Sequence, residues 1–325
     1  MEASSQRTTE QVRLALMLIV GVVAAAACVV TLMWWKAPAS SAQEEAPTGA
    51  NFVVQCGFSK QAQVDPIVNP GEPGTPEAKA HHLHDFFGNT TTDSNSTLES
   101  LRAAQTPTYP ATTCEPKPGN TFGDTAAYWI PTVSWTNSRG KTTQLKANQE
   151  FFYYRAGLKD PVDVKPHPAG LKIVTVQGKN VEWRCQNGNW STTPPTRCEN
   201  GKLVVRIFFP DCLAVDSSGQ PLLDTRDAEG NTLHVPDDHR SHMVDAGSAG
   251  CPSTHPYPVA RLQTNFQFPI PTTKGKPTLS SGAYSTMHVD FFNAWQEGDL
   301  EDLVARCINE APFTATNPKD ADCGA

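Results

Sequence analysis

The sequence predicts an all-β dominated fold: a single disulfide-stabilised sandwich or barrel-like domain with long loops and a short C-terminal helix, preceded by one N-terminal transmembrane helix. Three observations lead to this prediction. The 325-residue chain contains 27 prolines and 22 glycines, a composition that interrupts long helices and marks many turns. Its apolar runs mostly have strand length and are bounded by turn residues. Its 38% apolar content is enough for a packed core, which excludes a disordered chain.

The one long apolar run is residues 14–35, which contain no charged side chain. At about 1.5 Å per helical residue this segment can cross a hydrocarbon core of about 30 Å. A cleaved signal peptide has a shorter apolar stretch, although small residues farther on offer cleavage sites. Arg7 and Arg13 precede the segment, so the positive-inside bias places residues 1–13 in the cytoplasm. We expect a single-pass protein, held in the lipid bilayer by this segment, whose main domain is extracellular, or a secreted protein if the segment is cleaved.

The segment 36–50 is small, polar and proline-containing, as expected of a flexible stalk. The folded domain is expected over residues 51–325, where no internal repeat and no second linker interrupt the chain. One helix is predicted at Leu300–Ile308, where the apolar residues share one face and Asp299 can cap the first turn. The predicted strands, each bounded by Gly, Pro, Asn or Asp, are Tyr128–Trp135, Phe151–Arg155, Leu171–Gln177, Val181–Cys185, Leu203–Phe209, Leu262–Phe268 and Ser285–Phe292.

The cysteine pattern indicates an oxidising compartment. Of the nine cysteines, Cys28 lies in the apolar segment, and the other eight lie in the expected outer domain without any C-x-x-C pair. Disulfides are therefore favoured over thiolate metal ligation. The pairing is open from sequence, but the short loops between Cys185 and Cys198 and between Cys307 and Cys323 make these two pairs the preferred ones.

Charge and motif content exclude several classes of function. The formal net charge of −7 offers no basic face for a phosphate backbone, so nucleic acid is not expected as a partner. The sequence contains no G-x-S-x-G nucleophile elbow, no phosphate-binding glycine loop, no dinucleotide fingerprint and no H-E-x-x-H helix. A catalytic thiolate is also unexpected where the cysteines are oxidised.

Histidine clusters are the main functional signal. His82 and His84 are two residues apart, so an extended backbone projects both rings from one face. His288 and Asp290 have the same spacing on a predicted strand. Paired imidazoles suit metal ligation or acid–base chemistry, and we treat these four as candidate catalytic residues, with the three histidines also as candidate metal ligands. The alternative is that each is a hydrogen-bonded polar group of the core.

Three further residues are candidates for substrate contact. His242 and His255 lie in the long loop over residues 210–260, which can bring them to the same centre. Trp129 can stack on a substrate, although core packing is the alternative for a tryptophan on a strand. Asp65 and Asp124 are expected to be turn residues, because aspartate bonds its own backbone in turns.

Six motifs follow one another in order along the chain: Val64–Gly71, His82–Gly88, Tyr128–Pro131, Asp238–Met243, Cys251–Pro256 and His288–Trp295. Together they resemble the DUF1996 family, a domain of unknown function in secreted fungal and bacterial proteins, over roughly residues 52–308. The resemblance implies one outward-facing domain. It supplies no reaction, and the wall association of fungal relatives favours polysaccharide as the partner. The one departure is Thr254, where the family often has a smaller residue. The shared polar positions that the resemblance implies are His82, His84, His242, His255, His288 and Asp290.

Two functional classes remain open. The first is a hydrolase acting on cell-wall or extracellular polysaccharide, in which Asp290 orients a ring or acts as a base and a divalent metal could activate water. Glycosidases usually use two carboxylates, and no such pair is evident, which weighs against the ordinary mechanism. The second class is non-catalytic: a carbohydrate-binding or adhesion module, or a metal-binding surface protein that uses His82 and His84. A shared open pocket for the histidines would favour the first class.

Overall fold

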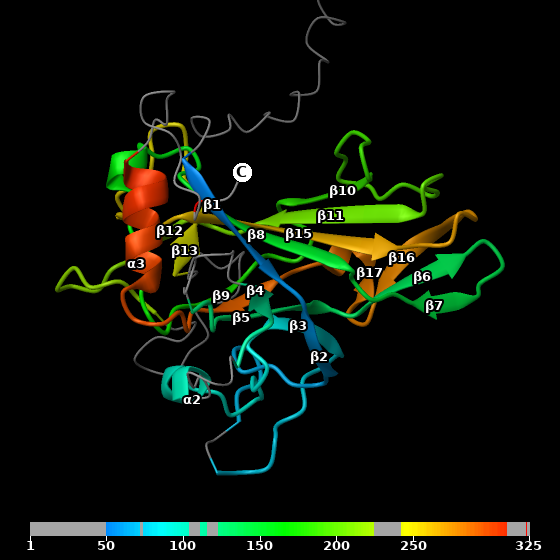
Figure 1. Ribbon diagram of the computed structural model, residues 1–325, viewed down its shortest axis with the longest axis horizontal. Helices are drawn as coiled ribbons and strands as arrows, with labels where there is room; N and C mark the ends of the chain where they lie inside the picture. The colour runs from blue at the N-terminus through cyan, green and yellow to red at the C-terminus, as the bar shows by residue number, and fades with distance from the viewer. Residues whose placement is uncertain are drawn as a thin grey trace, which may run out of the picture. The chain divides into compact units, whose positions relative to one another are not determined.

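The computed structural model describes residues 50–71, 74–103, 111–115, 123–223, 242–310 and 323. These residues form four sheets, and all paired neighbouring strands within them are antiparallel (Figure 1). Within this part of the chain no helix is long and apolar enough to cross a membrane. The predicted membrane segment 14–35, and all but the last residue of the predicted stalk, lie outside it.

The largest sheet has six strands in the order β10-β11-β15-β8-β1-β4. In β8 every second residue is buried (Glu150, Phe152 and Tyr154), which is the period of a strand covered on one face. The four strands predicted here are confirmed with small shifts at their ends. The strands of this sheet are β1 (Asn51–Cys56), β4 (Cys114–Glu115), β8 (Gln149–Arg155), β10 (Val181–Cys185), β11 (Lys202–Phe208) and β15 (Arg261–Pro269).

The second sheet has five strands in the order β2-β3-β5-β18-β9. Their bounds are β2 (Phe58–Ala62), β3 (His84–Gly88), β5 (Ala127–Pro131), β9 (Lys172–Val174) and β18 (Asp290–Phe292). It packs against the six-stranded sheet through aromatic rings. The ring centroids of Tyr128 and Phe152 are 4.0 Å apart, and those of Phe87 and Phe266 are 4.9 Å apart. The two sheets form the predicted sandwich, and the barrel alternative is wrong because neither sheet closes on itself.

The five-stranded sheet is also covered on its other face. There Phe86 stacks on Trp129, with centroids 5.4 Å apart, beneath Val64 and Ile67. The short helix α2 (Leu98–Ala103) adds Leu101 to this second apolar cluster. A sheet buried on both faces explains why all five residues of β3 and all five of β5 are buried. Polar side chains on this outer face are consequently held under the segment that precedes β3.

The predicted strand Tyr128–Trp135 is wrong in extent, because the chain changes sheets within it. β5 ends at Pro131, and β6 begins at Val133 in a different sheet. The four-stranded sheet, β17-β16-β6-β7, extends beyond the sandwich, and the three-stranded sheet is β13-β12-β14 (Figure 1). Their strands are β6 (Val133–Asn137), β7 (Thr142–Gln144), β12 (Cys212–Leu213), β13 (Met243–Val244), β14 (Tyr257–Pro258), β16 (Gly275–Leu279) and β17 (Gly282–Ala283).

The remaining helical elements are short. The predicted strand Ser285–Phe292 begins instead in a 3₁₀ turn, η2 (Tyr284–Thr286), and only its last three residues form β18. Another 3₁₀ turn, η1, covers Pro161–Asp163. The predicted C-terminal helix is confirmed as α3 (Asp299–Val304), which continues as a π-helical turn, η3 (Ala305–Asn309).

The start of α3 differs from the prediction. Gly298, with a φ of 86°, is its N-cap. That backbone conformation suits glycine. Asp299 lies inside the first turn, and its Oδ2 accepts a hydrogen bond from the backbone N–H of Gly123 at 2.8 Å. The carboxylate therefore ties the helix to the loop before β5 and does not cap it.

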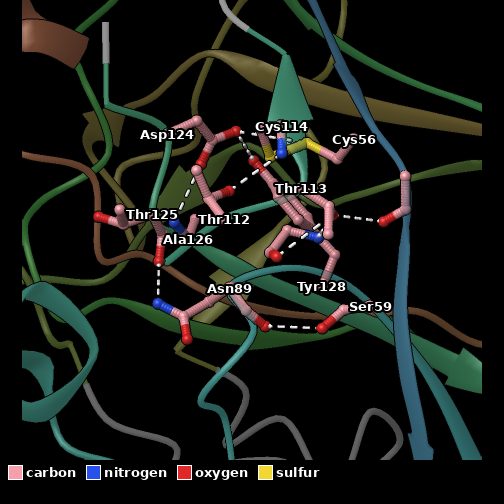
Figure 2. The surroundings of a disulfide bond; sticks show 12 residues. Cys56, Ser59, Asn89, Thr112, Thr113, Cys114, Asp124, Thr125, Ala126 and Tyr128 are labelled. Atoms are coloured by element: carbon pink, nitrogen blue, oxygen red, sulfur yellow. Dashed lines mark hydrogen bonds between the residues drawn. A yellow bond between two sulfur atoms is a disulfide. The ribbon is translucent and has the colours of Figure 1, made fainter. Parts of the chain in front are cut away.

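Four disulfides join all eight cysteines of the domain, and both predicted pairs, Cys185–Cys198 and Cys307–Cys323, are present. Cys212–Cys251 links β12 to the segment before β14. Cys56–Cys114 joins β1 to the edge strand β4 and lies beside Asp124, as Figure 2 shows. Cross-links of this kind stabilise a loop-rich domain by restricting its unfolded chain.

Candidate functional site

The candidate residues meet on the outer face of the five-stranded sheet. His84 lies in β3 two residues before Phe86, and Asp290 lies in β18 two residues before Phe292. Both phenylalanines belong to the apolar cluster on that face. Because side chains two apart on a strand share a face, His84 and Asp290 point to the same side as this cluster, away from the centre of the sandwich.

Strand register brings His288 beside His84. β5 lies between β3 and β18, and its Pro131 pairs with His84 while its Trp129 pairs with Asp290. If the register of β18 is continued by two residues, His288 also falls opposite Pro131. The two imidazoles therefore flank one small proline ring and can approach across it. Their ring centroids are 6.2 Å apart.

His82 completes a group of three rings. Its centroid is 4.3 Å from that of His84 and 5.2 Å from that of His288. One nitrogen from each of the three rings can be chosen so that all three atoms lie within 4.8 Å of one another. Nitrogen ligands about 2.1 Å from a tetrahedral metal ion are about 3.4 Å apart, so inward movement of about an ångström would complete such an arrangement.

Backbone carbonyls fix the orientation of two of these rings. Nδ1 of His84 is 3.0 Å from the carbonyl oxygen of Val64, and Nδ1 of His288 is 2.8 Å from that of Thr286. A carbonyl oxygen only accepts, so each Nδ1 carries the hydrogen and each Nε2 presents its lone pair. This arrangement of a bonded Nδ1–H and a bare Nε2 is the one that metal-ligating histidines commonly adopt.

All three rings are held neutral by their surroundings. Burial, together with the neighbouring rings of His82 and His288, lowers the pKa of His84 to about 3. Burial, with a smaller effect of His82, lowers the pKa of His288 to about 4. The pKa of His82 is lowered first by burial and then by His81. Neutral imidazoles are the protonation state that metal coordination requires.

A buried carboxyl group lies against these rings. Both carboxylate oxygens of Asp290 lack a hydrogen-bond partner among the described residues, and Oδ2 is 3.8 Å from Nε2 of His288. Burial, and then the charge of Asp65, raises the pKa of Asp290 well above its ordinary value. Buried polar atoms without partners are rare in folded proteins because their desolvation is not compensated. In the described part of the chain, Nε2 of His82 and Nε2 of His84 are also buried without hydrogen-bond partners.

Asp65 is the site residue that the sequence analysis assigned to a turn. Its Oδ1 accepts backbone hydrogen bonds from Ile67 at 2.8 Å and Val68 at 2.9 Å, so the turn role is confirmed. It also forms a group with His84 and Asp290 in which one donor atom of each lies within 4.8 Å of the others. Burial raises its pKa to about 6. The sequence did not indicate this second role, because the hydrogen bonds of a turn are enough to explain an aspartate at this position.

The cluster opens to solvent through a pocket of about 470 Å³. Besides Asp65 and the three histidines of the cluster, polar and apolar groups from two segments form its walls. The other lining residues are Val68, Asn69, Ala80, His81, Val174, Thr175, Val176 and Gln177. The segment before β3 thus supplies one wall, and β9 with the residues after it supplies the other.

Three predicted contact residues lie away from the pocket lining. Trp129 is 0% exposed, so neither face of its ring is open to a substrate. Its side chain is part of the packed core. His242 is buried, with Nε2 2.9 Å from the carbonyl oxygen of Lys172, and His255 bonds the hydroxyl of Thr254 at 3.0 Å. Neither histidine lines the pocket. Residues 224–241 of the predicted long loop lie outside the described residues.

The fold and site define a β-sandwich domain with an open pocket lined by three histidines and Asp65, with the buried carboxyl group of Asp290 beside His288. A comparison with models of protein families identifies the family of this domain. The model of DUF1996, a domain of unknown function, matches residues 65–295, so the chain belongs to this family, as its motifs predicted. Neither the curated proteins nor the solved structures contain a match to the chain.

Proposed function

We propose that His82, His84 and His288 bind one divalent transition-metal ion and that the pocket is the active site of a metal-dependent hydrolase. The observation that carries this proposal is a group of three neutral imidazoles, two of which, from His84 and His288, lie beside the buried carboxyl group of Asp290. That carboxyl group has no hydrogen-bond partner among the described residues. A cation at this point would satisfy the carboxylate and the bare nitrogens together. Neutral imidazole ligands suit zinc, copper, nickel and iron, and zinc is the simplest choice for hydrolysis.

The open pocket gives the metal a chemical role. Three protein ligands leave a coordination position for water, whose pKa a bound zinc ion lowers to near 7. Asp290, whose Oδ2 is 3.8 Å from Nε2 of His288, would be the base that takes a proton from that water. Asp65 lies on the same side of the cluster and supplies a second carboxyl group. The pair of carboxyl groups that the sequence did not reveal is therefore available for acid–base chemistry.

The proposed substrate is an extracellular polysaccharide. The amide side chains of Asn69 and Gln177 line the pocket and can hydrogen-bond sugar hydroxyls, and Val68, 45% exposed, adds apolar surface. An extracellular domain anchored by residues 14–35 agrees with the four disulfides, which form and persist in oxidising compartments.

Metal binding tests the proposal directly. The full-length chain, purified in detergent and stripped with a chelator, would be titrated with Zn²⁺ by calorimetry. We expect one ion per chain, with affinity at least about tenfold weaker in His84→Ala and His288→Ala. His255→Ala is the matched control, because it removes an imidazole outside the pocket, and it should bind zinc normally. Equal affinity in all four proteins, or no binding, would refute the metal site.

Hydrolysis needs a separate assay. The zinc-loaded chain would be incubated with a panel of wall polysaccharides, and released reducing ends would be measured. Release that disappears in Asp290→Asn while zinc binding remains would support a catalytic carboxyl group. Zinc binding with no release from any polysaccharide would instead support the non-catalytic alternative, a metal-binding surface protein.

A further inference from the structure

The outer face of the six-stranded sheet carries an unusual set of side chains. On β8 the residues Phe152 and Tyr154 point into the sandwich, so Phe151, Tyr153 and Arg155 point outward and are partly exposed. The neighbouring strands continue this pattern with amide, aromatic and guanidinium groups. The outward residues of β11 and β15 are Lys202, Val204, Arg206, Phe208, Arg261, Gln263, Asn265 and Gln267, of which Val204, Arg261, Gln263 and Gln267 are buried among their neighbours.

The register aligns these groups in rows across the sheet. Phe151 pairs with Asn265, which pairs on its other side with Arg206. This row therefore sets two planar polar groups beside an aromatic ring. Planar amides and guanidinium groups donate hydrogen bonds in fixed directions, and ring faces offer apolar contact at low conformational cost.

A ladder of alternating cations and rings runs along the edge of this face. The guanidinium carbons of Arg184 and Arg206 are each 4.1 Å from the centroid of the Trp190 ring. The guanidinium carbon of Arg206 is 5.1 Å from the ring of Phe208, and that of Arg261 is 4.9 Å from the same ring. Cation–π contacts of this length hold the arginines and rings in one orientation.

Trp190 is positioned by the covalent structure around it. It lies in the loop closed by the Cys185–Cys198 disulfide. Its neighbour Ser191 exchanges two backbone hydrogen bonds with Trp183 of β10, at 2.7 and 3.0 Å. The loop is thereby fastened to the edge of the sheet, and the indole is presented on the face without a long, mobile connection.

The charges along the ladder are unbalanced. Arg206 forms an ion pair with Glu182 at 2.6 Å, and Arg261 approaches Asp245 at 3.7 Å. Arg184 forms no ion pair with any residue that the structure describes, although Arg206 lies near it. Burial, and then the charge of Arg206, lowers the pKa of Arg184. An anion placed beside Arg184 would relieve this repulsion. The excess of positive charge stands out on a chain whose formal net charge is −7.

We propose that this face, centred on Arg184, Trp190 and Arg206, binds an acidic polysaccharide of the uronate class. A sugar carboxylate pairs with the guanidinium of Arg184, and the C–H face of a sugar ring packs on the exposed part of Trp190. Outward amides such as Asn265 are within the same face and can bond ring hydroxyls. The cations on this face are few, and rings and amides separate them. This spacing suits a polysaccharide with one charge per sugar better than a nucleic acid, whose charges lie closer together. The proposal is independent of the metal pocket, which lies on the five-stranded sheet.

The test compares a charged glycan with its neutral form. The full-length chain in detergent would be titrated by calorimetry with an oligogalacturonate and with the methyl ester of the same oligosaccharide. We expect binding of the acid only, weakening as salt is raised, and a loss of affinity of about tenfold in Arg184→Gln. Trp190→Ala should lose a similar factor while the acid remains the preferred ligand. Arg139→Gln, which removes the same charge from the exposed turn between β6 and β7, should bind like the unchanged chain.

Other results would overturn the proposal. Equal affinity for the acid and for its methyl ester would show that the sugar carboxylate is not recognised. Single-stranded DNA that binds more tightly than the oligogalacturonate, and loses this binding in Arg184→Gln, would show that the face binds a different class of ligand. Unchanged affinity in both Arg184→Gln and Trp190→Ala would exclude this face. Thermal unfolding midpoints of the variants, compared with that of Arg139→Gln, separate a lost contact from a lost fold.

Discussion

The substitution Asp124→Asn tests whether burial raises the pKa of a core carboxyl group and so makes stability depend on pH. The carboxyl group of Asp124 is buried beside the Cys56–Cys114 disulfide, where it accepts hydrogen bonds from the Tyr128 hydroxyl at 2.9 Å and the Ala126 backbone at 3.0 Å (Figure 2). Burial raises its pKa from 3.8 to about 7. The folded chain therefore holds a proton that the unfolded chain releases between these two values.

The sign and size of the effect follow from this difference. The contribution of Asp124 to stability is full below pH 3.8 and is lost as pH rises towards about 7. At about 1.4 kcal/mol per pKa unit, the loss is about 4 kcal/mol. Asparagine stays neutral at every pH, so Asp124→Asn removes the pH dependence. The free energy of unfolding of the variant, relative to the unchanged chain, should rise by about that amount between pH 4 and pH 8.

Urea unfolding of the full-length chain in detergent, followed by tryptophan fluorescence across this pH range, measures the effect. A constant offset between the two proteins reflects altered hydrogen bonds around the amide and does not bear on the argument. Asp216→Asn is the control: hydrogen bonds from Ser218 lower the pKa of this exposed group below 3.8, so its effect on stability falls below this pH range. Its difference from the unchanged chain should therefore stay nearly constant between pH 4 and pH 8. A difference between Asp124→Asn and the unchanged chain that stays constant to within about 1 kcal/mol from pH 4 to pH 8 would refute the reasoning.

Three further predictions concern stability and are checked by urea unfolding at neutral pH. Replacing Cys56 and Cys114 together by serine opens a loop with a sequence separation of 58 and should lower the free energy of unfolding by about 4 kcal/mol; an unchanged midpoint would mean that the disulfide constrains nothing. Asp211→Asn leaves the buried ammonium of Lys159 without its ion-pair partner and should cost about 3 kcal/mol or more, whereas a neutral result would show that water reaches the lysine. Gly275→Ala places a methyl group 2.7 Å from a backbone oxygen of β6 and should cost about 1–3 kcal/mol, and full stability would show that this strand pair can move apart.

Local patterns predicted those parts of the fold that depend on neighbouring residues. The strands at Phe151–Arg155 and Val181–Cys185 were predictable because alternation and bounding turn residues act over a few positions. The short loop Cys185–Cys198 was predictable as a disulfide for the same reason. The split of Tyr128–Trp135 between two sheets was not, since its two halves are equally apolar and only their partners differ.

The candidate site shows the same division. The i, i+2 spacing of His82 and His84, and of His288 and Asp290, predicted which side chains share a face. It did not show that β5 would lie between the two segments, nor that Asp65 would join them. The sequence also offered His242 and His255 as candidates, and the described structure has both outside the pocket.

The sequence by itself determined the strand periodicity, the family, and the set of histidines from which a site could be built, because short-range sterics and residue chemistry govern these. The tertiary structure alone decided which imidazoles meet, where the acidic partners lie, and which aromatic rings remain exposed. Strand order depends on how the whole chain buries its apolar faces, a sum over residues far apart in sequence. Segments around His84 and His288 are therefore joined by the packing of the entire sandwich.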